Sequence, residues 1–291
     1  MAGSFERRLG DGQVYVGSRD LSRAQEAFQD ALEAAEGPDE RSRALGGLGV
    51  VQDQLLDRVS AQRSLTEALE LAREAGSAEL VARLHDLALC HMGRGDSVSA
   101  VPLLEEAWPL WSAPERQAHS VEALASAYLS LDRLREAESA YQQLSSLGAE
   151  NQRGEWVLRG QNGRGEALRR AGRDQEAMRV FQSVVEALSS VGEPNRGQQE
   201  QAGIALHNLG VLLLEARPEA AAQCLEQAVT CFVSAFGVAE HPHVARAKAF
   251  QAVLARNAGS TEASDALFAE ALRLVAADDP VATELVPALR G

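Results

Sequence analysis

The chain has 291 residues, of which 45% are hydrophobic and 4% aromatic, and it carries a formal net charge of −14. This length supplies enough apolar side chains for a large core, and the scarcity of strand-forming residues favours helices. The 28 Lys and Arg residues form no dense run. Because the net negative charge of the protein would repel the phosphates of nucleic acid, no nucleic-acid partner is expected.

The cysteines and the N-terminal sequence indicate the compartment. Cys90, Cys224 and Cys231 are too few and too irregularly spaced for a disulfide framework or a closed zinc site. The opening sequence MAGSFERRLG lacks the apolar core of a secretory signal, and no apolar run is long enough to cross a bilayer. We therefore expect a cytoplasmic protein with no membrane insertion and no metal or other cofactor.

A spaced set of small and bulky residues recurs seven times along the chain. The small residues are Gly12, Gly49, Ala88, Ala125, Gly165, Gly210 and Ala252. Eleven or twelve residues later come Ala24, Ala61, Ala100, Ala137, Ala177, Ala221 and Ser264, and four residues further on come Phe28, Leu65, Leu104, Tyr141, Phe181, Leu225 and Phe268. Successive small residues are 37 to 45 residues apart, a spacing typical of stacked helical hairpins.

Each unit is predicted to be two antiparallel helices that approach closely at the small residues, with the bulky residue filling the space between layers. The aspartates expected to cap the second helices are Asp20, Asp57, Asp96, Asp132 and Asp174. An aperiodic helical bundle is the alternative, but it has no reason to place small residues at equivalent points seven times.

Gly and Pro residues at the joins set the boundaries of the units. The predicted units cover residues 3–37, 38–76, 77–113, 114–149, 150–193, 194–238 and 239–277. Residues 278–291 are expected to form a short capping helix after Pro280. No linker long enough to separate two domains is present, so residues 1–291 are expected to form a single domain.

These residues resemble the tetratricopeptide repeat, whose pattern is Leu-Gly, a later Tyr, then Ala and an aromatic residue. The matches include Leu48-Gly49 with Ala61, Leu209-Gly210 with Ala221, and Gly12, Tyr15, Ala24 and Phe28 in the first unit. The repeats exceed the common length of about 34 residues. In this greater length they are similar to kinesin light chain repeats. The sequence His241-Pro242-His243 also resembles the sequence that opens a helix in those repeats.

The resemblance implies an all-α, right-handed α-solenoid of about seven hairpins plus a C-terminal capping helix. First helices would line a concave groove. The residues carried over to that groove are His85, Asp86, His119, Glu122, Arg159, Asn162, Glu166, Arg169, His207, Asn208, Arg246 and Arg256. Units one and two would instead supply a smoother, less polar stretch made of Leu9, Gly10, Gln13, Gly46, Gly47 and Val50.

Amides and basic groups give this groove its expected chemistry. Asn162 and Asn208 each offer a donor and an acceptor, so they can pair with the backbone of an extended peptide, or be solvated groove positions. The arginines give a local basic area where an acidic segment can dock. The histidines His85, His119 and His207 are expected to be hydrogen-bonding residues in a wet groove, with metal or acid-base roles as the alternative.

No phosphate-binding glycine loop, nucleophile elbow or paired-histidine metalloprotease motif is present in the sequence. We therefore expect a protein that is not an enzyme. The sequence favours a scaffold or adaptor that binds a peptide segment or helix of a partner in its groove. Two alternatives remain open: a peptide-sensing regulator that controls a separate effector chain, and a structural subunit that self-associates into a homo-oligomer through its open ends.

Overall fold

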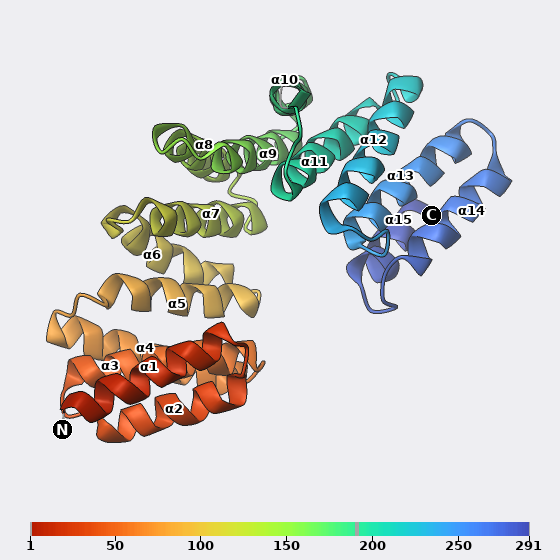
Figure 1. Ribbon diagram of the computed structural model, residues 1–291. Helices are drawn as coiled ribbons and strands as arrows, with labels where there is room; N and C mark the ends of the chain where they lie inside the picture. The colour runs from red at the N-terminus through yellow and green to blue at the C-terminus, as the bar shows by residue number, and fades with distance from the viewer. Residues whose placement is uncertain (1, 190–191, 291) are drawn as a thin grey trace. The chain divides into compact units, whose positions relative to one another are not determined.

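The computed structural model describes residues 2–189 and 192–290, and the regular elements in these residues are all helical. Seven hairpins, each a first helix followed by a second helix, account for most of them (Figure 1). They are α1 (Ala2–Gly17) with α2 (Leu21–Ala34), α3 (Pro38–Gln54) with α4 (Arg58–Ala75), α5 (Leu80–Gly93) with α6 (Ser97–Ala107), α7 (Pro114–Ser130) with α8 (Leu134–Glu150), α9 (Gly154–Arg170) with α10 (Asp174–Ser189), α11 (Arg196–Leu213) with α12 (Pro218–Phe236), and α13 (Pro242–Asn257) with α14 (Thr261–Arg273). The predicted all-α fold of seven hairpins is confirmed.

Shorter elements complete the chain. A 3-10 turn, η1 (Trp108–Leu110), follows α6. The C-terminal end consists of a π-helical turn, η2 (Val281–Leu285), and α15 (Val286–Arg290). No helix in the described part of the chain is both long and apolar enough to span a membrane.

The chain divides into two compact units, residues 1–140 and residues 141–291, with the boundary inside α8. The N-terminal unit contains the first three hairpins and α7. The C-terminal unit contains α9 to α15. The single domain over residues 1–291 that the sequence indicates stays a prediction.

The small residues of the repeat lie where the bulky residues pack. A Cβ atom added to Gly12 would lie 2.7 Å from the Phe28 ring, and one added to Gly165 would lie 2.5 Å from the Phe181 ring. The same relation joins Gly49 to Leu65 and Gly210 to Leu225. Phe28 and Phe181 are 3% and 0% exposed, and burial of each such side chain contributes roughly 1.5–3 kcal/mol. In these four hairpins, the spacing seen in the sequence is therefore the packing contact between the two helices.

Three of the five predicted aspartate caps form. The Asp20, Asp57 and Asp96 side chains each accept a hydrogen bond from a backbone N–H three residues later. Asp132 and Asp174 are wrong as caps, because α8 begins at Leu134 and α10 begins at Asp174 itself. Asp132 instead adopts a left-handed backbone conformation in the turn, with φ of 58°.

The start of α11 has a reciprocal cap that stabilises the C-terminal unit. Asn195 Oδ1 accepts from Gln198 N at 2.9 Å, and Gln198 Oε1 accepts from Asn195 N at the same distance. We expect Asn195→Ala to lower the free energy of unfolding by about 1 kcal/mol, because it leaves a helix-terminal N–H without its partner. Urea unfolding measures this loss. Asn195→Ser should retain most of the stability, and equal losses in the two variants would contradict the capping role.

A left-handed residue recurs in the turns within the hairpins, two positions before the second helix begins. These residues are Arg19, Leu56, Gly95, Asp132, Gly172 and Gly259. Leu56 is the apolar member of the set that carries a side chain, and its φ is 64°. For an L-residue with a Cβ this conformation costs roughly 1–2 kcal/mol, which glycine avoids.

The last hairpin is covered as the sequence predicts. Val281 and Val286 are 1% and 2% exposed, and they pack with Phe268, Val253 and neighbouring alanines. The C-terminal segment therefore caps the apolar face of α13 and α14, which confirms the capping helix.

Candidate functional site

Within each compact unit, the repeat brings one recurring position of a first helix towards the next first helix, as at Gly46 with Arg83 and at Asn162 with Gln201. This position lies three residues before the small residue and is occupied by Leu9, Gly46, His85, Glu122, Asn162, His207 and Ala249. Asn162 contacts Gln201, and the charge of Arg116 acts on His85. Gln201 and Arg116 each lie nine positions before the small residue of their own unit. We call the side chains that meet in this register the first-helix face, and it exists separately in each compact unit.

Asn162 is the most constrained polar residue of the first-helix face in the C-terminal unit. It is 4% exposed. Its amide nitrogen donates to both the backbone O and the side-chain Oε1 of Gln201, each at 2.9 Å. A backbone carbonyl can only accept, so this contact fixes which end of the amide is the nitrogen. The Oδ1 atom is buried and has no hydrogen-bond partner, so the side chain offers an acceptor alone.

His207 follows on α11 and is 9% exposed. Burial, with smaller contributions from Arg246, His243 and Arg169, lowers its pKa from 6.5 to about 3, so the imidazole is neutral at pH 7. The ring meets Phe250 edge to face at a centroid distance of 5.4 Å, and Nδ1 is buried without a partner. A neutral imidazole has one donor and one acceptor nitrogen.

The remaining candidates of the C-terminal unit differ in their surroundings. Arg169 is tied to Glu166 by two parallel hydrogen bonds, Nη2 to Oε1 at 2.7 Å and Nε to Oε2 at 2.8 Å. Arg159 lies 3.9 Å from Glu155 in an i,i+4 pair. Asn208 is half-buried beside His207 on α11, and Arg246 is exposed on α13.

Arg256 lies apart from this group on α13. Ten residues separate it from Arg246, which is roughly 15 Å along the helix axis. Its Nη1 atom donates to the backbone O of Arg290 at 3.2 Å. The structure therefore places Arg256 against the C-terminal capping segment.

In the N-terminal unit His85 lies beside Trp111, with ring centroids 6.2 Å apart and the planes nearly perpendicular. Burial lowers the pKa of His85 to about 4, and the nearby charges of His119 and Arg116 add to this effect. The Arg116 guanidinium lies 5.1 Å from the Trp111 ring centroid. His85 Nε2 and Trp111 Nε1 are both buried without partners. His119 is exposed, and Glu122 is half-buried one turn further along α7.

The smoother, less polar stretch expected from units one and two is interrupted at Gly46. The guanidinium of Arg83, from α5, occupies the space over Gly46 that a side chain there would need. Arg83 is 9% exposed, and it donates to Glu79 at 3.2 Å and lies 3.6 Å from Asp86. Burial raises the pKa of Asp86 to about 6, against the opposing charge of Arg83. Gly46 therefore admits a buried cation to the first-helix face.

Two polar residues of this face, Arg83 and Gln201, are not among the groove residues predicted from the sequence. For Gln201 a signal existed, since it lies nine residues before Gly210, the register position that faces the preceding unit. For Arg83 no spacing pattern gives a signal, because its place depends on the missing side chain of Gly46.

Metal binding finds no cluster to support it. Among residues 2–189 and 192–290, no group of three or more His, Cys, Asp or Glu side chains is close enough to hold a metal ion.

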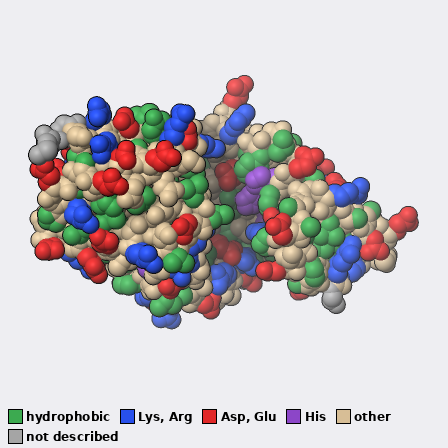
Figure 2. Space-filling view, turned by 90° about the horizontal axis from the view of Figure 1, so that it is seen from below, with side chains coloured by type: hydrophobic (Ala, Val, Ile, Leu, Met, Phe, Trp, Pro, Cys, Tyr) green, Lys and Arg blue, Asp and Glu red, His purple; other side chains and the backbone are tan. Residues whose placement is uncertain are grey.

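On the face shown in Figure 2, acidic and basic side chains are interspersed across the surface.

Comparison with known proteins gives likeness in structure alone. No family model matches the sequence, and no curated protein matches it. A tetratricopeptide repeat protein from Parabacteroides merdae has a TM-score of 0.70 at 16% identity, over 99% of this chain and 100% of that chain. The kinesin light chain TPR-like repeats of Podosopora anserina give 0.56 at 21%, over 70% and 100%. NprR in complex with its cognate peptide NprX gives 0.62 at 10%, over 98% and 82%. At these identities the likeness concerns the fold.

Proposed function

Because the chain has the fold of tetratricopeptide repeat proteins, we propose that it is a non-enzymatic scaffold or adaptor whose first-helix face binds a partner protein. The bound element is an extended peptide segment or a helix. The proposal covers residues 1–291 as one binding domain. The face in the C-terminal unit carries it, because the buried polar atoms there are already oriented.

The single observation behind the proposal is the unpartnered Oδ1 of Asn162. A buried acceptor without a partner costs free energy, about 1–3 kcal/mol, and a ligand N–H recovers it after a side-chain movement that exposes Oδ1 to the ligand. The donors of this amide are already used by Gln201. A peptide backbone supplies N–H groups regardless of its sequence, so it is the ligand that this arrangement fits.

Charge supports an acidic segment within the ligand. Glu166 neutralises Arg169, whereas Arg246 is exposed on α13. His207 is neutral and adds no charge. An acidic side chain next to the bound backbone would therefore pair with Arg246.

A screen of random 12-residue peptides, followed by fluorescence anisotropy on the tightest binder, tests this function. We expect Asn162→Ala and Asn208→Ala each to weaken binding about tenfold, which corresponds to about 1.4 kcal/mol. Asn208→Ala should leave the thermal midpoint unchanged because Asn208 is half-buried. Asn257→Ala, at an exposed residue at the end of α13, is the matched control. Unchanged affinity in both variants would contradict the proposal.

A peptide-sensing regulator is the second candidate. Likeness to NprR, whose structure holds its cognate peptide, supports it. The two candidates share the first-helix face but differ in response, because a sensor must change shape or assembly when the peptide binds. Small-angle scattering with and without the screened peptide distinguishes them. A scaffold should give the same profile in both states.

A further inference from the structure

Four aromatic rings join the sixth hairpin to the seventh in the C-terminal unit. Phe232 and Phe236 lie in the last turns of α12. His241 is the N-cap residue of α13, and His243 lies in its first turn. The His241 ring stacks on Phe236 with a centroid distance of 3.6 Å and an interplanar angle of 13°. The His243 ring stacks on Phe232 at 4.9 Å and 14°, and we call the four rings the aromatic stack.

His241 also caps α13 through its side chain. Its Nδ1 atom accepts a hydrogen bond from the backbone N–H of His243 at 3.3 Å, so the proton of the neutral ring lies on Nε2. Of the described first helices α3, α5, α7, α9 and α11, α11 alone has a side-chain N-cap, and Asn195 supplies it. An amide keeps its acceptor at every pH, whereas a protonated histidine has two donors and no acceptor. The cap of α13 is therefore sensitive to pH.

His241 faces two carboxylates from other elements. Burial lowers the pKa of His241 below 6.5, and it outweighs the negative charges of Glu200 on α11 and Asp279 after α14, which raise the pKa. The contact from α12 is apolar, through the ring of Phe236. His241 is therefore mostly neutral at pH 7.

His243 faces positive charge instead. Burial lowers its pKa to about 4, and the charges of His241 and Arg246 lower it further. His207 on α11 is close enough for the charge of His243 to act on it. The α12 side of the ring is the apolar Phe232. Protonation would place three cations, His241, His243 and Arg246, at the start of α13, where the positive end of the helix dipole disfavours them.

We propose that the aromatic stack is an acid-sensitive latch, which holds the start of α13 against α12 while both histidines are neutral and releases it when they are protonated. Arg246 is exposed near the start of α13, so release displaces the arginine that pairs with an acidic side chain of the ligand. This second step rests on the proposed function, whereas the release itself does not.

The direction of the pH dependence follows from proton binding. The folded pKa of His243, about 4, lies below the ordinary value of 6.5, so the closed latch binds fewer protons than the open latch between these values. The stabilisation of the closed latch is fully present above pH 6.5 and is lost as the pH falls towards 4. From pH 7 to pH 5 the ratio of open to closed forms should rise about tenfold or more.

Hydrogen exchange with mass-spectrometric detection at pH 7 and pH 5 measures the release, with each rate divided by the intrinsic rate at that pH. The backbone N–H of Ala245 donates to the backbone O of His241 at 3.0 Å, so protection of α13 begins there. We expect the protection factors of residues 245–250 to fall about tenfold from pH 7 to pH 5, because exchange of these amides follows local opening.

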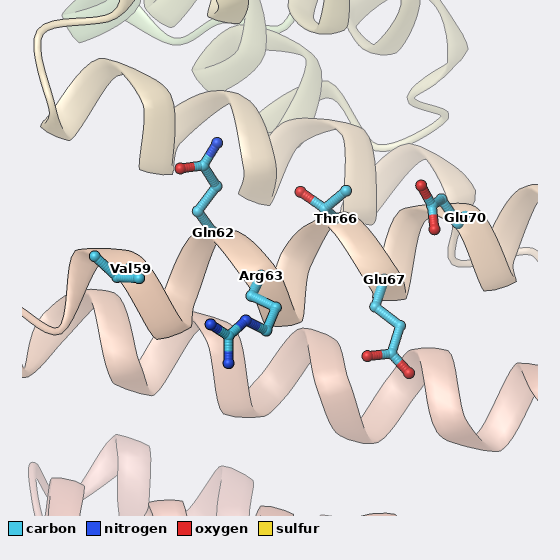
Figure 3. Close-up of a pocket in the computed structure, with 6 residues that line it drawn as sticks. All are labelled: Val59, Gln62, Arg63, Thr66, Glu67 and Glu70. Atoms are coloured by element: carbon cyan, nitrogen blue, oxygen red, sulfur yellow. The ribbon is translucent and has the colours of Figure 1, made fainter.

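Helix α4 of the N-terminal unit is the internal reference. It also begins with a side-chain cap, from Asp57, and it contains no histidine. Hydrogen bonds from Ser60 lower the pKa of Asp57, so this cap stays ionised at pH 5. Figure 3 shows the side chains that line a hollow of about 450 Å³ along α4, and none is a histidine: Val59, Gln62, Arg63, Thr66, Glu67 and Glu70. Protection at the start of α4 should therefore change little.

The double variant His241→Asn/His243→Phe removes both protons and keeps the structure. Asparagine is a strong N-cap, and phenylalanine keeps a ring on Phe232. This variant should lose most of the fall in protection, whereas His207→Phe, outside the stack, should retain it. If the double variant is unstable, His241→Asn alone should show a smaller fall than wild type. Equal falls in wild type and these variants would overturn the proposal. So would protection that rises in acid, because cation–π attraction would then close the latch.

The screened peptide tests the link between the latch and the ligand. A ligand that binds only the closed form, at a hundred times its Kd, should raise the protection of residues 245–250 at pH 5 about a hundredfold. A peptide that binds without changing this protection would contradict the displacement of Arg246. A chain that binds no peptide would contradict the proposed function alone, because the exchange measurement needs no ligand.

Discussion

Gly160→Ala is expected to lower the free energy of unfolding by about 3 kcal/mol. A Cβ atom at this position of α9 would lie 2.6 Å from Tyr141 O and 2.7 Å from Ser145 N on α8. Both atoms belong to the backbone, so a side-chain rotation cannot relieve the clash and the two helices must separate. Overpacking of this kind costs typically 1–3 kcal/mol, and the backbone contact places this case at the upper end.

Gly10→Ala is the matched control for this substitution. Gly10 lies within α1, and a Cβ atom there would have no neighbour within 4 Å. Alanine should raise the free energy of unfolding by about 0.5–1 kcal/mol through its helix propensity. Guanidinium unfolding of both variants measures the contrast. A loss at Gly10 similar to that at Gly160 would show that helix packing is not the cause.

Acid is expected to destabilise the protein through His207. Its folded pKa of about 3 lies below the ordinary value of 6.5, so the folded state binds fewer protons than the unfolded state between these values. The contribution is fully present above pH 6.5 and is lost as the pH falls towards 3. From pH 7 to pH 5, this residue alone should remove about 2 kcal/mol from the free energy of unfolding.

His207→Phe isolates this effect because phenylalanine keeps an aromatic ring against Phe250 but cannot be protonated. The variant should show a difference between pH 7 and pH 5 that is smaller than that of wild type by about 2 kcal/mol. Asn257→Ala, at an exposed position without a titratable group, should leave the difference unchanged. If the pH dependence of His207→Phe equals that of wild type, His207 is not buried in its neutral form.

The hairpin fold follows from packing rules that act at fixed sequence spacing. A helix pair closes where a small residue faces a bulky one, and the pairing of Gly12 with Phe28 or Gly165 with Phe181 can be found by counting residues. Helix caps are harder to predict from the sequence, because a shift of one residue in the start of a helix moves the cap to a different side chain. Asp132 and Asp174 each miss the cap by one position, since the turn before α8 uses a left-handed aspartate and α10 starts at Asp174 itself.

The candidate site is less predictable, because its chemistry depends on contacts between units. The sequence identifies Asn162 as a polar residue of a first helix. It does not show that Gln201, 39 residues away, holds both amide hydrogens and leaves only the acceptor. Likewise, Gly46 predicts a smooth surface by itself, and only the structure shows that Arg83 lies over it.

Photo-crosslinking tests the central claim of peptide binding by the first helices most directly. A benzoylphenylalanine residue replaces Asn208 on first helix α11 in one variant and Gln223, exposed on second helix α12, in another. The account predicts that the screened peptide crosslinks at position 208 and not at position 223. Crosslinking at position 223 alone would contradict it.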